Sequence, residues 1–289
     1  MPPPSSAPAR GASATARGAA GLRAAHVLLD DPPPILDDRV AVQLLEPGAA
    51  QSIMAQADRF NVPASLALRC EIAVRNRYAE DCLRAEASAG TIGQYVILGA
   101  GLDTFAYRQP TWGAGLSLFE VDHAASQMDK RIRLKRAEIA EPANLRYVEA
   151  DLESNSLLAN LLAAGVDPAR PAFVACLGVL IYLDEPAVYR IMSVVASLAP
   201  GSRFVFTFSR PDATRAKPAA ASPVAARAAA AGEPWRTRFE PRVIDARLRQ
   251  SGFGTVDFLY ADHVKELYLR HREDGLRQPA RVVIADARV

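Results

Sequence analysis

The stretch YVILGAGLDTFAYR, from Tyr95 to Arg108, begins as an apolar strand and stops at two closely spaced glycines. A glycine at a strand end has no side chain, so the backbone can bend sharply and approach another molecule closely. In parallel sheets, ligands bind beyond the carboxyl ends of the strands, which is where Gly99 and Gly101 fall. The stretch therefore predicts either a ligand-binding turn or a plain tight turn.

On both sides of this stretch, apolar segments alternate with helical patterns. Seven segments are predicted as strands, over residues 94–99, 116–122, 145–151, 172–180, 202–209, 255–260 and 280–287. A long helix is expected just before the first strand, over residues 64–87. Because alternation of this kind produces parallel strands with helices on both faces, the predicted fold is a doubly wound α/β sheet.

The composition predicts one globular domain. Half of the 289 residues are hydrophobic and 23% are charged, which is ordinary for a globular chain. Residues 1–21 are predicted as a disordered tail, with a transit peptide as the alternative. Residues 22–289 form the predicted domain, with N-terminal helices over 22–90, a core over 91–289 and an insertion over about 211–241. The insertion reads either as flexible or as a short Ala-rich helix near residues 225–231.

The charge and cysteine patterns narrow the possible partners. A net charge of +2 gives no case for nucleic acid. No apolar run reaches the roughly 18–20 residues that span a bilayer, and three scattered cysteines without a C-x-x-C pair fit a reducing compartment and no zinc site. We therefore expect a cytoplasmic protein without metal or membrane partner, as a monomer or homodimer.

Acidic residues follow the second and third predicted strands. Glu120 and Asp122 lie about 20 residues beyond the glycines, where an acid commonly binds ribose hydroxyls. Asp151 ends the third strand beside Leu152, and this pair could hold an adenine ring. The alternative for Asp151 is helix capping. Acids at two successive strand ends beside a glycine turn predict an adenosine pocket.

The glycine turn departs from the dinucleotide pattern G-x-G-x-x-G, because its sixth position is Thr104. Asp103 within the turn suits the amine or sulfonium of S-adenosylmethionine better than a pyrophosphate. Arg75 and Arg77, on the preceding helix, could bind the carboxylate of that cofactor through a guanidinium fork. Their alternative is a solvated helix face.

Several motifs in fixed order resemble one family. The segments QYVILGAGLDTFAYR, FEVD, EADL, LGVLIYLDEPAV, GEPWRTRFEP and GFGTVDF are similar to those of the leucine carboxyl methyltransferase-like family. This family belongs to the class I S-adenosylmethionine-dependent methyltransferases and includes bacterial polyketide O-methyltransferases. The resemblance covers residues 22 to 289. It implies a Rossmann-like, seven-stranded sheet with an antiparallel last strand and a lid of N-terminal helices.

The resemblance also implies roles for individual residues. The cofactor carboxylate falls to Arg75 with Arg77 nearby, the ribose to Asp122 with Glu120 as competitor, and the adenine to Asp151 and Leu152. The methionine part falls to Asp103 and to the backbone of Gly99, Ala100 and Gly101. Two positions depart from the family: Ile97 stands where many members have an acid, and Leu177 where protein-methylating members have a glutamate beside the cofactor.

The predicted reaction is O-methylation of a small molecule, at a carboxylate or hydroxyl of a secondary metabolite. A carboxylate is ionised at neutral pH and needs no general base, whereas a hydroxyl needs one, with His263 and His26 as candidates. Tyr182 and Arg210 are the predicted acceptor contacts, and Trp235 and Arg238 could line the pocket from the insertion. The alternatives are a non-catalytic S-adenosylmethionine-binding member and an NAD-dependent oxidoreductase.

Overall fold

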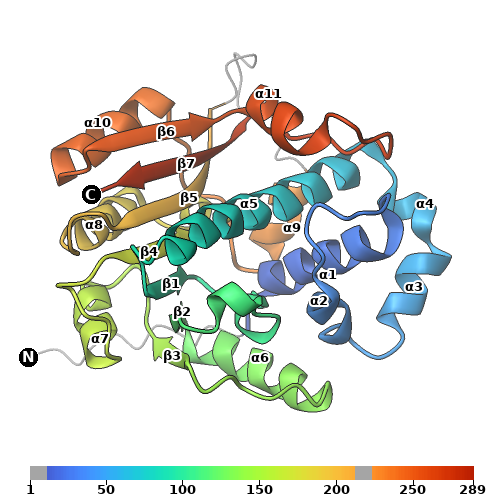
Figure 1. The fold of residues 1–289 in the computed structure, drawn as a ribbon. Coiled ribbons are helices and arrows are strands. Elements are labelled where there is room, and N and C mark those ends of the chain that lie inside the picture. Colours follow the sequence, from blue (N-terminus) through green and yellow to red (C-terminus); the bar gives the residue numbers. More distant parts are fainter. Residues whose placement is uncertain (1–11, 212–222) are drawn as a thin grey trace, which may run out of the picture.

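The computed structural model describes residues 12–211 and 223–289. Its seven strands are β1 (Gln94–Leu98), β2 (Ser117–Asp122), β3 (Leu145–Glu149), β4 (Ala172–Cys176), β5 (Arg203–Ser209), β6 (Thr255–Leu259) and β7 (Val282–Arg288). They form one sheet in the order β3-β2-β1-β4-β5-β7-β6 (Figure 1). Strands β1 to β5 pair in parallel, and β7 pairs antiparallel with both β5 and β6. The predicted seven-stranded α/β sheet with an antiparallel last strand is confirmed.

Helices precede the sheet and then alternate with its strands. The helices before β1 are α1 (Ala14–Leu29), α2 (Arg39–Gln43), α3 (Ala49–Ala55), α4 (Ala57–Phe60) and α5 (Pro63–Ser88). The later ones are α6 (Ala124–Arg136), α7 (Leu157–Ala163), α8 (Glu185–Ala196), α9 (Pro223–Ala230), α10 (Pro241–Ser251) and α11 (Ala261–Val264). Short turns of 3-10 helix are η1 (Phe105–Tyr107), η2 (Thr111–Gly113) and η3 (Leu180–Tyr182), and η4 (Lys265–Leu269) is a turn of π-helix. None of the helices in the described part of the chain is long and apolar enough to cross a membrane.

The sheet separates two hydrophobic cores, because successive side chains of a strand point to opposite faces. Val96 and Leu98 of β1 pack in the core that includes residues of α7, α8 and α10. Tyr95 and Ile97 of the same strand pack in the core that includes residues of α5. Helix α5 crosses the front of the sheet in Figure 1, and α1 to α4 lie beside it. Both faces are therefore covered, as a parallel sheet requires.

Helix α1 begins within the segment predicted as a disordered tail. Ser13 caps the helix, and its hydroxyl accepts a hydrogen bond from the backbone N–H of Ala16 at 3.0 Å. A serine cap followed by an Ala-rich segment favours helix, so residues 14–21 form the first turns of α1 and the predicted tail was too long. Residues 1–11 lie outside the described part of the chain, as do residues 212–222 of the predicted insertion. The rest of the insertion begins with α9, close to the predicted Ala-rich helix.

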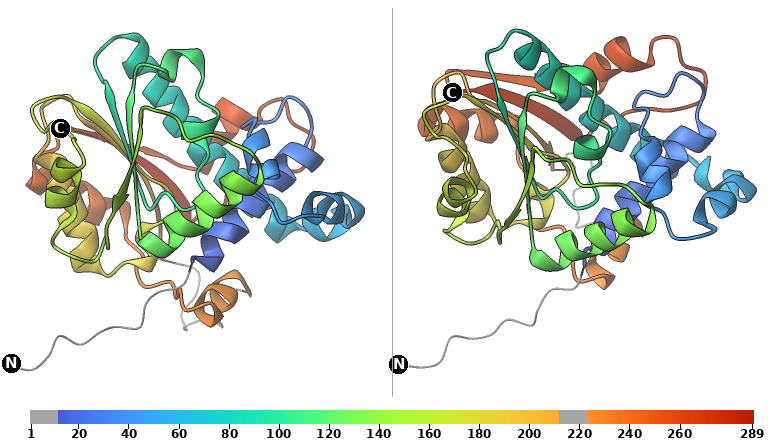
Figure 2. Two further views of the ribbon diagram at one scale, coloured as in Figure 1. Left: turned by 90° about the horizontal axis from the view of Figure 1, so that it is seen from below. Right: turned by 60° about the horizontal axis from the view of Figure 1, so that its bottom comes forward.

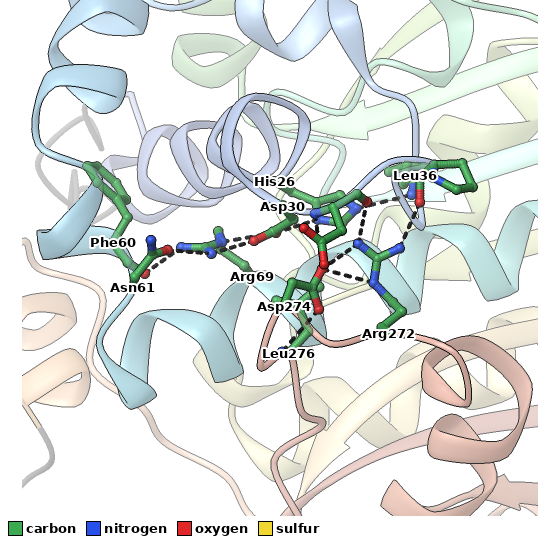
Figure 3. Close-up of polar contacts among 11 residues, drawn as sticks. His26, Asp30, Leu36, Phe60, Asn61, Arg69, Arg272, Asp274 and Leu276 are labelled. Carbon is green, nitrogen blue, oxygen red and sulfur yellow. Dashed lines mark hydrogen bonds and ion pairs between the residues drawn. The ribbon is translucent and has the colours of Figure 1, made fainter.

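A buried polar network fastens α1 to α5 (Figure 3). His26 of α1 contacts Asp30 Oδ2 through Nδ1 at 2.7 Å. Arg69 of α5 donates to both oxygens of Asp30 and to the backbone oxygen of Phe60. Leu36 N–H donates to His26 Nε2 at 3.3 Å, so both ring nitrogens of His26 have a polar partner. This network joins the end of α1 to α5.

Candidate functional site

A large cavity opens at the carboxyl ends of the parallel strands. Its volume is about 980 Å³. The start of α1, one face of α5, the turns after β1 to β4, the last residues of β5 and the segment 231–236 line it. The order of strands reverses between β1 and β4, and ligands of doubly wound sheets bind at that switch point.

The glycine turn after β1 lies directly in this cavity. Gly99 and Ala100 donate their N–H groups to Val121 O at 2.8 and 3.0 Å. Both Gly99 and Gly101 have positive φ, +67° and +48°, which side chains disfavour. A Cβ at Gly99 would lie 2.5 Å from a methyl carbon of Val179. The turn therefore requires glycine and exposes its backbone to the cavity.

Asp122 fixes the turn from the end of β2. Its Oδ2 accepts from Gly101 N–H at 2.6 Å, and its Oδ1 accepts from His123 N–H at 2.7 Å. Asp103 lines the cavity within the turn, and its Oδ1 accepts from Phe105 N–H at 2.9 Å. Both carboxylates are thus oriented by backbone donors before any ligand is present.

The next strand end adds Asp151 and Leu152 to the cavity wall. Asp151 Oδ1 accepts from Glu153 N–H at 2.9 Å, within the turn before α7, and its side chain is 48% exposed. His123 Nε2 lies 3.8 Å from the same oxygen. Leu152 is buried and supplies apolar surface beside them. A polar edge next to an apolar side chain is the arrangement expected around an adenine. Adenine binding by Asp151 and Leu152 stays a prediction.

Arg75 projects into the cavity from α5. Its Nη1 donates to Glu71 Oε1 at 3.2 Å, and its Nε is buried without a hydrogen-bond partner among the described residues. The guanidinium lies so close to Gly178 that a Cβ at that position would meet its atoms at 2.4–2.6 Å. The glycine after β4 therefore leaves room for Arg75, and Leu177 and Tyr182 line the same region.

Arg77, by contrast, lies outside the cavity. It pairs with Asp81 at 2.8 Å and donates to Ile35 O. Residues two apart on a helix do not share a face, so Arg75 and Arg77 could not both reach the same ligand. The prediction that Arg77 lies close to the cofactor finds no support in the geometry.

Glu120 also lies away from the cavity wall, although the sequence left it as a competitor of Asp122. It is buried beside Lys130 of α6, with Nζ 2.5 Å from Oε2. Burial raises the pKa of Glu120 to about 7, against the charge of Lys130, which lowers it. Because Glu120 lies within β2 rather than at its end, α6 covers its side chain.

The remaining predicted acceptor contacts divide between the cavity and other places. Tyr182 and Trp235 line the cavity, whereas Arg210, Arg238 and His263 are not among its lining residues. His263 lies within α11, where its Nδ1 accepts from Tyr260 N–H at 3.3 Å. His26 belongs to the buried network described above. The structure thus brings neither candidate base to the cavity.

Three contributors to the site went unnoticed in the sequence. Glu71 lies one helical turn before Arg75, Arg281 lies just before β7, and residues 14–22 of α1 cover the glycine turn. The i, i+4 spacing of Glu71 and Arg75 was a usable signal, because such residues share a helix face. Arg281 and α1 had no local signal, since their positions depend on tertiary packing.

The comparisons with known proteins identify the family. Residues 16–196 match the family model described as leucine carboxyl methyltransferase. A Bacillus subtilis protein named "Putative S-adenosyl-L-methionine-dependent methyltransferase YktD" is 34% identical over 205 residues, 70% of this chain and 67% of that protein. A similarly named Mycolicibacterium smegmatis protein is 37% identical over 65% of this chain and 64% of its own length. The aligned segments thus span about two thirds of each relative.

Solved structures show the same fold. A Thermobifida fusca protein, titled "putative methyltransferase", has a TM-score of 0.57 at 18% identity, over 99% of this chain and 98% of its own. A DUF574 family protein from Streptomyces avermitilis has a TM-score of 0.54 at 16% identity, over 92% and 96%. From the family match and the relatives, the chain belongs to the leucine carboxyl methyltransferase family of S-adenosylmethionine-dependent methyltransferases. Its cofactor is accordingly S-adenosylmethionine.

The residues present fit that cofactor. The glycine turn exposes backbone where a side chain would clash, and the buried Arg75 Nε lacks a described partner. Asp103, Asp122 and Asp151 place carboxylates along the same wall. Within the described residues, no group of three or more His, Cys, Asp or Glu is arranged as metal ligands would be.

Proposed function

We propose that the chain transfers a methyl group from S-adenosylmethionine to an oxygen of a small organic acid, or else to a hydroxyl. The cavity carries this proposal, because about 980 Å³ is at the upper end of the range for ligand pockets, roughly 300–1,000 Å³. It has room for a cofactor at the glycine turn and a second small molecule beyond it. When bound, the cofactor supplies a methyl group already activated by its sulfonium.

The acceptor side of the cavity supports a carboxylate as the receiving group. Of the four histidines only His123 lines the cavity, and it lies beside Asp151. A hydroxyl acceptor would need a base, whereas a carboxylate is already ionised at neutral pH. Arg281, whose guanidinium carbon is 5.4 Å from the centre of the Trp235 ring, adds positive charge to the wall. Leu177 adds apolar surface.

The chain's own contribution is orientation and exclusion of water. Backbone donors hold Asp122 and Asp103, and α1 covers the glycine turn so closely that a Cβ at Gly101 would lie 3.0 Å from Ala16 Cβ. Holding two reactants in the right orientation can lower the activation barrier by about 7–11 kcal/mol. This requires no nucleophilic side chain. Tyr182, at the cavity wall, is the proposed acceptor contact.

The oxidoreductase alternative is disfavoured by the element that follows β1. A dinucleotide pyrophosphate binds at the N-terminus of a helix following the glycine turn. Here the three-residue turn η1 follows, and no α-helix lies between β1 and β2. Parallel calorimetric titrations with S-adenosylmethionine, S-adenosylhomocysteine and NAD should show binding of the first two alone. Binding of NAD alone would reverse this assignment.

Methyl transfer itself is tested with S-adenosylmethionine labelled in its methyl group. The purified protein is incubated with a panel of small carboxylic acids and matched phenols, and products are treated with mild alkali. Methyl esters release labelled methanol and methyl ethers do not, so the release distinguishes the two acceptors. The Gly99→Ala variant, whose Cβ would clash with Val179, is the control. Cofactor binding without label in any small molecule would favour the non-catalytic alternative.

A further inference from the structure

Glu71 and Arg75 present opposite charges side by side in the cavity. Both lie on the face of α5 that lines it, together with Leu68, Ile72 and Asn76. Their side chains are 16% and 11% exposed. The pair is therefore a largely buried wall of the cavity and not an ion pair on a solvated helix surface.

The hydrogen bonding of this pair is incomplete. Arg75 Nη1 donates to Glu71 Oε1 at 3.2 Å, but no described residue donates to Glu71 Oε2. Arg75 Nε also lacks a partner among the described residues. A buried charge pair offsets its desolvation only when its remaining polar atoms are satisfied. Each member of this pair therefore has bonding capacity left for a ligand.

The cost of burying Glu71 argues against a purely structural role. Burial raises the pKa of Glu71, while the charges of Arg75 and Arg281 lower it. A glutamate on an exposed helix face would give the same i, i+4 pairing without that cost. Titratable groups in a cavity whose pKa is shifted by burial and by a nearby charge are candidates for function.

We propose that Glu71 binds the α-ammonium group of the cofactor, while Arg75 binds its carboxylate. A cation and an anion held next to each other are complementary to the two charged groups on the α-carbon of an amino acid. Leu177, next to the Gly178 that faces Arg75, has no charge to offer an ammonium group. Glu71 provides a carboxylate from α5 instead. The inference depends on the cofactor and is independent of the acceptor.

The test compares S-adenosylhomocysteine with two analogues that each lack one charged group. The analogues are 5′-(3-carboxypropylthio)-5′-deoxyadenosine, which lacks the ammonium, and 5′-(3-aminopropylthio)-5′-deoxyadenosine, which lacks the carboxylate. Affinities are measured by calorimetry for wild type, Glu71→Gln and Glu71→Asp. The matched control is Glu266→Gln, which removes a carboxylate that is 61% exposed and outside the cavity. Thermal unfolding of each variant checks folding.

Wild type and the control should bind S-adenosylhomocysteine about 10- to 100-fold more tightly than the analogue without ammonium, as a charged hydrogen bond would give. In Glu71→Gln this preference should disappear. The analogue without carboxylate should bind Glu71→Gln more weakly than it binds wild type. The analogue without ammonium should bind the variant as tightly as wild type or more tightly, because Arg75 is no longer paired with Glu71. Glu71→Asp should restore part of the preference. A general structural defect would instead weaken the binding of both analogues to the same extent.

Two results would overturn the proposal. One is an unchanged preference for S-adenosylhomocysteine in Glu71→Gln. The other is equal affinity of wild type for S-adenosylhomocysteine and the analogue without ammonium, which needs no variant. Neither result depends on methyl transfer, so failure of the proposed function is distinguishable from failure of this assignment.

Discussion

At the scale of single residues, Gly178 has two separate requirements. Its φ of +75° lies where side chains are disfavoured, and the Arg75 guanidinium occupies the space in which a Cβ would stand. Gly165, after α7, has a φ of +99° but nothing within 4 Å of its missing Cβ. The two glycines therefore separate backbone strain from displacement of Arg75.

We expect Gly178→Ala to weaken binding of S-adenosylhomocysteine by tenfold or more. The added methyl group must push Arg75 from its position, and tenfold is about 1.4 kcal/mol. Gly165→Ala should cost about 1 kcal/mol or more of stability through its φ alone and leave affinity unchanged. Calorimetry and thermal unfolding of both variants check this. Equal affinity in the two variants would contradict the arrangement of Arg75.

Of two basic residues on α5 and two acidic residues on β2, only one of each pair reaches the cavity, for local geometric reasons. Arg75 reaches the cavity and Arg77 does not, because two residues along a helix turn the side chain away. Asp122 ends β2 and holds Gly101, while Glu120 lies within the strand under Lys130. The sequence narrowed each choice to two residues, and the packing of α5 and α6 decided between them.

At the scale of elements, the placement of α1 depends on Asp30. Asp30 is the C-cap residue of α1, and its carboxylate receives hydrogen bonds from His26 and Arg69. Burial opposes its ionisation, but those hydrogen bonds and the charge of Arg69 outweigh burial and lower the pKa of Asp30 from its usual 3.8. A second contact, from Arg272 to the backbone oxygens of Asp31 and Pro33, holds the following loop (Figure 3).

We expect Asp30→Asn to lower the free energy of unfolding by about 3–5 kcal/mol at pH 7, because Arg69 is left buried without its partner. A lowered pKa contributes stability above the unfolded value, near 3.9, and loses it as pH falls toward the folded value. The gap between wild type and variant should shrink below about pH 4, where the carboxylate of Asp30 becomes protonated.

Urea unfolding across that pH range provides the measurement. Asp37→Asn is the control, since Asp37 pairs with Arg39 at an exposed position and should change stability by about 0.5 kcal/mol or less. A gap that widened below about pH 4 would show that Asp30 is not ionised in the folded protein.

At the scale of the whole molecule, segments from both ends of the chain meet over the cavity. Thr15 of α1 donates its N–H to Glu233 Oε2 at 2.9 Å, and Figure 2 shows α9, just before Glu233, beside the start of α1. Arg281, just before β7, lines the same cavity. The cover of the cavity thus consists of parts distant in sequence, while its floor is the sheet.

We expect bound S-adenosylhomocysteine to slow amide hydrogen exchange in residues 14–22 and 231–236. Amide hydrogens exchange when a segment opens locally, and loosely held segments open most easily. A ligand that contacts these segments stabilises their closed arrangement and so slows the exchange. Residues of α10 and β6, which do not line the cavity, serve as the internal control. Protection confined to the turns after β1 and β2 would show that the cover takes no part in binding.

The sequence by itself determined the sheet and its glycine turn, because both follow from local rules. Apolar segments of strand length, alternating with helical patterns, predicted all seven strands. The glycines at positions 99 and 101 predicted the tight turn, and both have the positive φ that glycine allows. The antiparallel β7 came from the family resemblance. Helix α1 was underestimated because its capped start lies next to a Pro- and Ala-rich segment.

The tertiary structure alone decided which side chains share the cavity. Glu71, Arg281 and the start of α1 come together only after α5, β7 and the N-terminal helices have packed on the sheet. His263 and His26, plausible bases in one dimension, are used elsewhere. The physical reason is that strand and turn formation depend on neighbours in sequence, whereas a binding site depends on contacts between residues as far apart as Thr15 and Glu233.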